Sequence, residues 1–205
     1  MTTHPPAGPG AQRANVKKSR MLVSAGVFIA LYFVVFMVFG MLCMPVPLLY
    51  ILMPGLIALF AAPVYCMLVT KAPMHGPVFI AALLPGLFLM LQGNIWVVGF
   101  TAALAGVLAE VALGIGRFKN KKWTLVSYLL FTQNLWGGFL PVWIMRDAFF
   151  ERSAGMGEDF LNTLRALTPT WVLFAQLALV VVCALVGFAL ASRLFKKHFE
   201  KAGIV

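Results

Sequence analysis

Apolar segments long enough to cross a lipid bilayer recur along almost the whole chain. The stretch FIALYFVVFMVFGML (Phe28–Leu42) is one of them, and its apolar residues do not alternate with polar ones. A helix needs about 20 apolar residues to span a ~30 Å hydrocarbon core, whereas a membrane β-strand alternates over about 10 residues. Only 11% of the residues are charged, too few to cover a water-facing surface, because soluble domains average about 25%. The chain is therefore predicted to be an all-α, polytopic membrane protein.

The positions of these segments predict a bundle of six transmembrane helices. Residues 1–18, whose first part is rich in Pro, Gly and small polar residues, are expected to form a disordered cytoplasmic tail. Residues 19–205 are expected to form one membrane domain that binds a substrate. The predicted spans are Met21–Leu42, Leu48–Val69, Pro77–Leu91, Ile95–Gly116, Leu125–Met145 and Trp171–Leu194.

The basic residues predict which ends of the helices face the cytoplasm. With six spans, every Lys and Arg except Arg146, Arg152 and Arg165 falls on the side that holds both termini. Short loops rich in Lys and Arg stay inside the cell. Both termini are therefore predicted to be cytoplasmic, in a multi-pass protein of the cell membrane. The net charge of +10 comes from clusters beside apolar segments, so we expect no nucleic-acid partner.

Signatures of catalysis and of nucleotide binding are missing from the sequence. It contains no GxxxxGK[ST] loop, no HExxH and no GxSxG. Cys43, Cys66 and Cys183 are far apart and lack the spacing of metal ligands. We therefore expect a non-catalytic chain with no cofactor and no metal site of its own.

Glu110 is the only acidic residue clearly inside a predicted span. An ionisable residue within the membrane is a functional candidate by default. Its position towards the basic end of the span also allows a structural ion pair with a Lys or Arg. The sequence alone leaves both interpretations open.

Three clusters of polar and aromatic residues are predicted to lie on the external side. Asn and Gln in lipid need hydrogen-bond partners and tend to face the interior, and a small-molecule site combines apolar walls with a few fixed polar groups. Interfacial anchoring of the tryptophans and a helix-end ion pair between Arg146 and Asp147 are the competing interpretations. The candidate substrate-binding residues are Gln92, Asn94, Trp96, Gln133, Asn134, Trp136, Trp143, Arg146 and Asp147.

Two further features concern packing at the two sides of the bundle. The segment GEDFLNTLRALT (residues 157–168) places Phe160, Leu161, Leu164 and Leu167 on one helical face, which predicts an external cap over the bundle. In the first span, Ala25, Gly26 and Ala30 form a small-residue face that allows another helix to approach closely. That face is expected either to contact another membrane subunit or to pack internally.

Several strings in the chain resemble a known family. LYFVVFMVFGML, LLYILMPGLIALFAAPVY, NLWGGFLPVWIMRDAFF and KKHFEKAGIV are similar to the MptD-type (Trep_Strep) group of S components of energy-coupling factor (ECF) transporters. The resemblance runs from about residue 19 to the end. It implies a subunit that captures a micronutrient outside the cell and contacts a membrane T component through its first span. Two cytoplasmic ATPase subunits would then supply ATP-driven release of the substrate inside.

The sequence leaves other functions and the identity of the ligand open. A stand-alone secondary carrier for a small organic solute is the main alternative, and a membrane enzyme or an assembly factor is a third possibility. A carrier is expected to show ionisable residues at the middle of the membrane or an internal repeat. The aromatic content of the candidate site fits a vitamin or a tetrapyrrole, and an iron chelate is also compatible.

Overall fold

The computed structural model describes residues 9–201, and the side chains of residues 15–196. Within this range the chain is helical and contains no strand. The elements, in chain order, are α1 (Pro9–Cys43), α2 (Pro47–Phe60), α3 (Ala62–Lys71), α4 (Pro77–Leu91), α5 (Trp96–Ile115), α6 (Lys121–Phe131), α7 (Gln133–Gly137), α8 (Pro141–Ile144), α9 (Arg146–Arg152), the 3-10 helix η1 (Ala154–Met156), α10 (Glu158–Leu167) and α11 (Thr170–Lys201).

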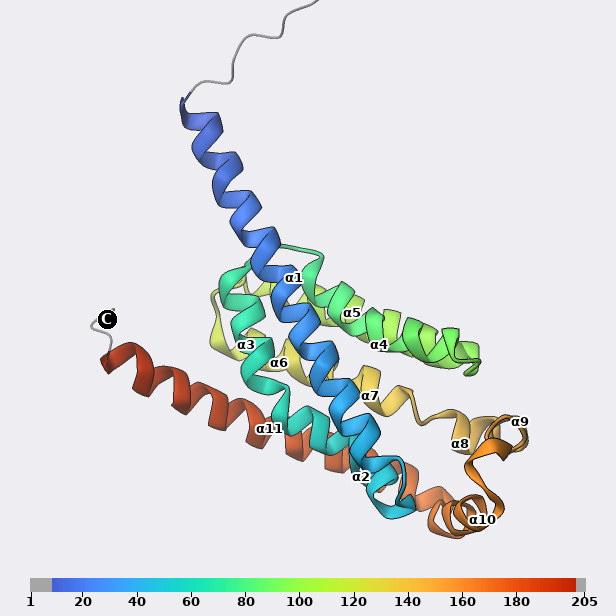
Figure 1. Cartoon of the computed structure of the whole chain (residues 1–205). Coiled ribbons are helices and arrows are strands. Elements are labelled where there is room, and N and C mark those ends of the chain that lie inside the picture. The colour runs from blue at the N-terminus through green and yellow to red at the C-terminus, as the bar shows by residue number, and fades with distance from the viewer. Residues whose placement is uncertain (1–8, 202–205) are drawn as a thin grey trace, which may run out of the picture.

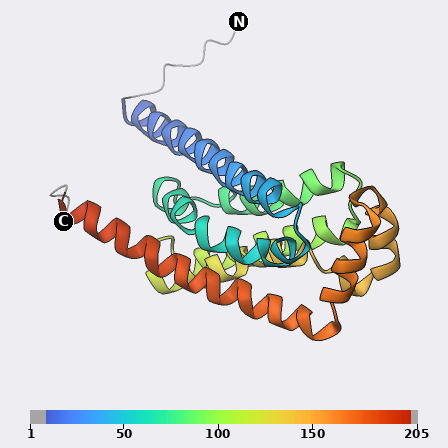
Figure 2. The ribbon, with the colours of Figure 1, turned by 60° about the horizontal axis from the view of Figure 1, so that its bottom comes forward.

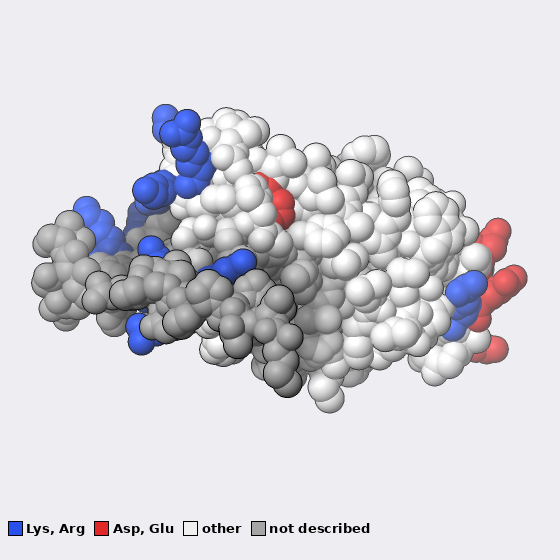
Figure 3. All heavy atoms as spheres, turned by 90° about the horizontal axis from the view of Figure 1, so that it is seen from above, with Lys and Arg blue, Asp and Glu red and all other residues white. Residues whose placement is uncertain are grey.

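The helices form an elongated bundle with two different ends (Figures 1 and 2). The start of α1 and the end of α11 lie at one end, which we call the basic end because Lys and Arg side chains gather there (Figure 3). The short helices α8, α9, η1 and α10 gather at the opposite end, which we call the loop end (Figure 1). The described charges at the loop end include acidic as well as basic side chains (Figure 3).

Several helices in the described range have the length and apolarity needed to cross a membrane. They are α1, α5 and α11, and the bent pair α2–α3 also qualifies if it is counted as one span. Helix α4 is apolar but shorter. These helices confirm the predicted all-α membrane class, while the count of six spans and the side of each terminus stay predictions. The tail predicted for residues 1–18 lies partly outside the described residues, and from Pro9 onward its residues belong to helix α1.

The second predicted span is bent by 40° between α2 and α3. Pro63 carries no N–H, so the carbonyl of Leu59 lacks its usual helical partner, and the helix breaks at Ala61. Gly187 of α11 packs directly over this break. A Cβ placed on Gly187 would lie 2.5 Å from the Leu59 carbonyl oxygen, so only glycine allows the two backbones to approach this closely.

The fifth predicted span, Leu125–Met145, is divided into α6, α7 and α8. Pro141 cannot donate to the carbonyl of Gly137, which instead accepts the Leu140 N–H at 3.2 Å. This interruption turns the backbone at Gly138–Leu140, so that successive side chains face different neighbours. Broken helices of this kind are tolerated in membranes only where they are buried in protein or line a cavity.

Aromatic side chains and a few internal hydrogen bonds hold the centre of the bundle together. Tyr65 and Tyr128 are fully buried, and their ring centroids lie 4.8 Å apart. The Tyr65 hydroxyl is paired with Ser127 Oγ at 2.6 Å, and Ser127 Oγ donates to the carbonyl of Ala109. Tyr128 donates to the carbonyl of Ala58. These bonds satisfy hydroxyl groups that have no access to water.

The predicted amphipathic segment is confirmed as α10 at the loop end. Leu164 is fully buried, and Phe160, Leu161 and Leu167 pack against a second hydrophobic cluster that includes Phe149 and Phe150. The opposite face of α10 carries charged and polar residues. The segment between α8 and α11 therefore covers the loop end of the bundle.

Candidate functional site

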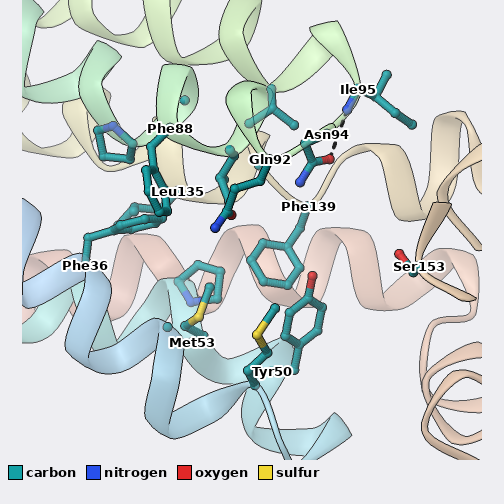
Figure 4. A pocket seen from close by; sticks show the side chains of 18 of the residues that line it. Phe36, Tyr50, Met53, Phe88, Gln92, Asn94, Ile95, Leu135, Phe139 and Ser153 are labelled. Atoms are coloured by element: carbon teal, nitrogen blue, oxygen red, sulfur yellow. Dashed lines mark hydrogen bonds between the residues drawn. The ribbon is translucent and has the colours of Figure 1, made fainter. Parts of the chain in front are cut away.

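A cavity of about 360 Å³ opens at the loop end of the bundle (Figure 4). This volume lies within the range of small-molecule sites, about 300–1,000 Å³. Its walls come from α1, α2, α4, α5, α7, α9, η1 and the turn between α4 and α5. Five aromatic side chains line it, namely Phe36, Tyr50, Phe88, Phe139 and Phe149, and so do five methionines, namely Met37, Met41, Met44, Met53 and Met156.

The cavity has a polar mouth and a mostly apolar floor. The cavity meets the surface at two exposed residues, Gln92 in the α4–α5 turn and Arg152 at the end of α9. Ile57 and Val98 line the cavity and are almost completely buried, so the cavity reaches well into the bundle. Tyr50 and Phe139 pack against each other in its wall, with ring centroids 4.9 Å apart (Figure 4).

Asn134 supplies a polar group at the buried end of the cavity. It lies on α7, the short helix that the breaks in span five create, and only 5% of the residue is exposed. Its Nδ2 donates to the carbonyl of Ala82 on α4 at 3.0 Å. The hydroxyl of Tyr32 on α1 lies 3.4 Å from both Oδ1 and Nδ2. Asn134 thus connects three helices while it faces the cavity.

The polar side of the mouth is formed by the α4–α5 turn and the end of α9. Gly93 has a positive φ of 87°, which lets the turn reverse the chain directly after α4. Arg152 Nη1 donates to the Gly93 carbonyl at 2.8 Å, so the two segments are joined at the entrance. Asn94 Oδ1 accepts the Ile95 N–H, which leaves its amide NH2 available to a ligand (Figure 4). Ser153 also lines this side.

Three of the nine predicted substrate-binding residues, Gln92, Asn94 and Asn134, line the cavity. The three predicted tryptophans do not. Trp96 is 62% exposed and packs near Phe100 on the outer surface. The Trp136 indole donates to the carbonyl of Leu173 in α11, and the Trp143 indole donates to the carbonyl of Pro169 just before α11, both at 3.2 Å.

The remaining predicted residues serve the packing of the loop end and of α7. Arg146 donates to the carbonyls of Thr168 and Arg165, and its guanidinium lies over the Phe150 ring. Asp147, next to it, is exposed, and no Arg146–Asp147 ion pair is found among the described side chains. Gln133 Nε2 donates to the Leu129 carbonyl, and its buried Oε1 has no partner within the protein. The structure therefore does not gather all nine residues into one site.

Comparison with known proteins gives a family for the chain. Residues 19–201 match the family model described as a hypothetical bacterial integral membrane protein (Trep_Strep). The chain belongs to the Trep_Strep family. No curated protein and no solved structure matches this Trep_Strep chain.

Glu110 of this Trep_Strep protein caps a neighbouring helix. Its Oε1 accepts the backbone N–H groups of Gly76, Val78 and Phe79 at 2.9–3.1 Å, all at the start of α4. Its Oε2 lies 3.2 Å from His75 Nδ1, and no Lys or Arg among the described side chains forms the ion pair anticipated from the sequence. The first N–H groups of a helix have no partner within it and favour negative charge. The position of Glu110 is therefore explained by the packing of α4 against α5.

The small-residue face of α1 is only partly turned towards the interior. Ala25 is buried in the main hydrophobic cluster, whereas Gly26 and Ala30 are exposed. A Cβ placed on Gly26 would meet no other atom within 4 Å. Internal packing therefore accounts for Ala25 but not for Gly26 and Ala30, which lie on the outer surface of the Trep_Strep bundle among apolar side chains such as Val23 and Val27.

Most of the cavity wall was not anticipated from the sequence. In the sequence, the phenylalanines and methionines that line the cavity cannot be distinguished from those that face lipid, because both occur in uniformly apolar segments. The one signal in the sequence was the density of methionine between Met37 and Met53, where Met37, Met41, Met44 and Met53 all turn out to line the cavity. No cluster of three or more His, Cys, Asp or Glu that could hold a metal is present within the described part of the Trep_Strep chain.

Proposed function

We propose that this protein is the substrate-capture (S) subunit of an ECF-type, ATP-driven importer. The observation that carries the proposal is the loop-end cavity, which has the size of a small-molecule site and combines apolar walls with a few polar groups. Its mouth lies at the end of the bundle opposite the basic end. The positive-inside rule places basic ends in the cytoplasm, so the mouth would face the outside of the cell.

The energy for uptake would come from partner subunits. Glu110, the buried carboxylate of the described spans, is occupied by three backbone N–H groups and lies near the basic end, away from the cavity. It is therefore a poor candidate for coupling a substrate to a proton or ion gradient within this chain. In the proposed assembly a T component contacts α1, where the exposed Gly26 and Ala30 would allow a partner helix to approach closely.

Purification from native membranes tests the capture role while the substrate is still unidentified. A tagged chain is expected to co-purify with a multi-span membrane subunit and two ATPase subunits, and mass spectrometry is expected to detect a retained small organic molecule. Met53→Trp, which enlarges a side chain in the cavity wall, should reduce the retained molecule and leave the partners in place. Gly40→Leu is a second filling variant, because a Cβ on this cavity-lining residue meets no atom within 4 Å.

Two results would contradict the proposal. One is a chain that retains the same molecule in both filling variants, since the cavity would then not be the binding site. The other is uptake of that molecule by liposomes that contain the purified chain alone and no ATP, which would favour the secondary carrier.

A further inference from the structure

The chemistry of the loop-end cavity narrows the class of its substrate. We infer that the substrate is a compact, flat, mostly apolar ring compound that carries one anionic group, and that Arg152 binds this group at the mouth. The inference rests on the proposed capture function, because it takes the cavity to be the binding site. It is drawn from three properties of the cavity, namely its volume, the shape and polarity of its walls, and the distribution of its charged groups.

The volume limits the size of the substrate. At about 360 Å³ the cavity lies near the lower end of the range of small-molecule sites, about 300–1,000 Å³. A compact molecule with one or two fused rings fits a site of this class.

The walls favour a planar ring system. Tyr50 and Phe139 approach the cavity from α2 and from the segment after α7, and Phe88 and Phe36 line its deeper part (Figure 4). Aromatic faces bind flat π-systems by stacked or edge-to-face contacts. The flexible methionines around them, such as Met53, adapt their shape and make favourable contacts between sulfur and aromatic rings.

The charges favour an anion at the mouth. Arg152 is the one charged side chain that lines the cavity within the described residues, and none of its described lining residues is acidic. Its Nη1 uses one N–H to hold the Gly93 carbonyl, which fixes the guanidinium beside the entrance and leaves its other donors for a ligand. A guanidinium binds carboxylates and phosphates through charge-assisted, often paired hydrogen bonds. Ser153 and the Asn94 amide lie on the same side and add neutral donors.

The arrangement also predicts the orientation of the bound substrate. Its ring system would occupy the aromatic part of the cavity, where Asn134 offers one hydrogen-bonding group at the buried end. Its anionic group would stay at the solvent-exposed mouth, which avoids the cost of taking a charge into the membrane interior. A cationic compound would meet the positive charge of Arg152 without a counter-charge in the described lining.

Three probes that share the same ring but differ in charge test the preference for an anionic group. 2-Naphthoate, 2-naphthamide and 2-naphthylmethylammonium are measured by equilibrium dialysis against the full-length chain in nanodiscs. Binding to the cavity is defined as the part that is lost in Met53→Trp, with Gly40→Leu as the second filling variant. This definition subtracts partitioning of the probes into lipid. We expect the affinity of the cavity to be highest for the naphthoate and lowest for the ammonium compound.

Arg152→Gln provides the decisive comparison. It should weaken binding of 2-naphthoate about five- to tenfold, somewhat less than a buried hydrogen bond to a charged group contributes, because Arg152 is exposed. It should change binding of 2-naphthamide less than twofold. Arg165→Gln is the matched control, since this arginine also lies at the loop end but outside the cavity and over the Phe150 ring. It should leave the affinity for both probes unchanged.

The outcomes distinguish this inference from the proposed function. Cavity binding that is equal for all three probes, or naphthoate binding that is unchanged in Arg152→Gln, would overturn the anionic class and leave the capture role standing. Absence of cavity binding for every probe would overturn the ring class as well. The capture role itself is decided by the co-purifying partners and by the retained molecule.

Discussion

Replacing Glu110 by alanine should destabilise the bundle without altering the substrate cavity. The substitution removes the acceptor for the N–H groups of Gly76, Val78 and Phe79, and with it the contact to His75. Glu110 is 8% exposed, so water cannot easily replace the carboxylate. The start of α4 would keep unpaired donors next to α5, and the cost would appear in the free energy of unfolding.

The expected loss is about 3 kcal/mol. Hydrogen bonds to charged groups contribute about 1.5–3 kcal/mol each, but these three share one oxygen atom and do not add independently. Loss of a helix cap alone costs about 0.5–2 kcal/mol. Glu110→Gln keeps an oxygen acceptor and loses mainly the interaction of the charge with the helix dipole. This variant should therefore cost about 1 kcal/mol.

Thermal unfolding followed with a thiol-reactive fluorophore provides the assay, because the chain contains free Cys43, Cys66 and Cys183 in buried or half-buried positions. At roughly 2–4 °C per kcal/mol for a chain of this size, Glu110→Ala should lower the Tm by about 6–12 °C. Glu110→Gln should lower it by about 2–4 °C. His75→Ala is the control and should have little effect, since 68% of its side chain is exposed. Equal losses in both Glu110 variants would refute the capping argument, and so would loss of the retained molecule at an unchanged Tm.

Three further substitutions test other contacts. Asn134→Ala should weaken retention of the small molecule. The Tm should fall by about 2–8 °C, because the buried hydrogen bond to the Ala82 carbonyl is lost. A variant that retains the molecule fully would remove this residue from the site. Gly187→Ala should lower the Tm by roughly 2–8 °C, because its Cβ would collide with the Leu59 carbonyl, and an unchanged Tm would show that the two helices separate easily. Gly26→Leu should preserve the Tm and the retained molecule but reduce co-purification of the membrane partner; undiminished co-purification would exclude this face as the contact.

The apolar segments of the sequence were enough to predict a helical membrane bundle, but not the path of the helices within it. The start and end of α4 agree with the predicted third span, although Pro85 lies inside it. The break before Pro63 could be expected from the sequence, because a proline inside a helix interrupts its hydrogen bonds. Its geometry, however, depends on Gly187 from a helix far along the chain, and no local pattern encodes that contact.

The candidate site was predictable where polar residues stand out against an apolar background. Asn134 illustrates this, because an amide inside a membrane helix needs partners and therefore faces the interior. Trp136 lies two residues further on and faces α11 instead, since α7 is a short helix on which these two positions point in different directions. Phe139 and Met53 could not be assigned to the cavity, because hydropathy is the same for a side chain that faces lipid and one that faces a ligand.

The bend between α2 and α3 has a consequence for how the protein is made. Ribosomes deliver the second span to the membrane long before the last one, so the exposed Leu59 carbonyl must wait for Gly187 to be synthesised before this break is covered. During that interval the nascent chain presents an uncovered peptide group to the bilayer or to the insertion machinery. The bend between α2 and α3 is therefore completed only when α11, the last helix to be made, joins the bundle.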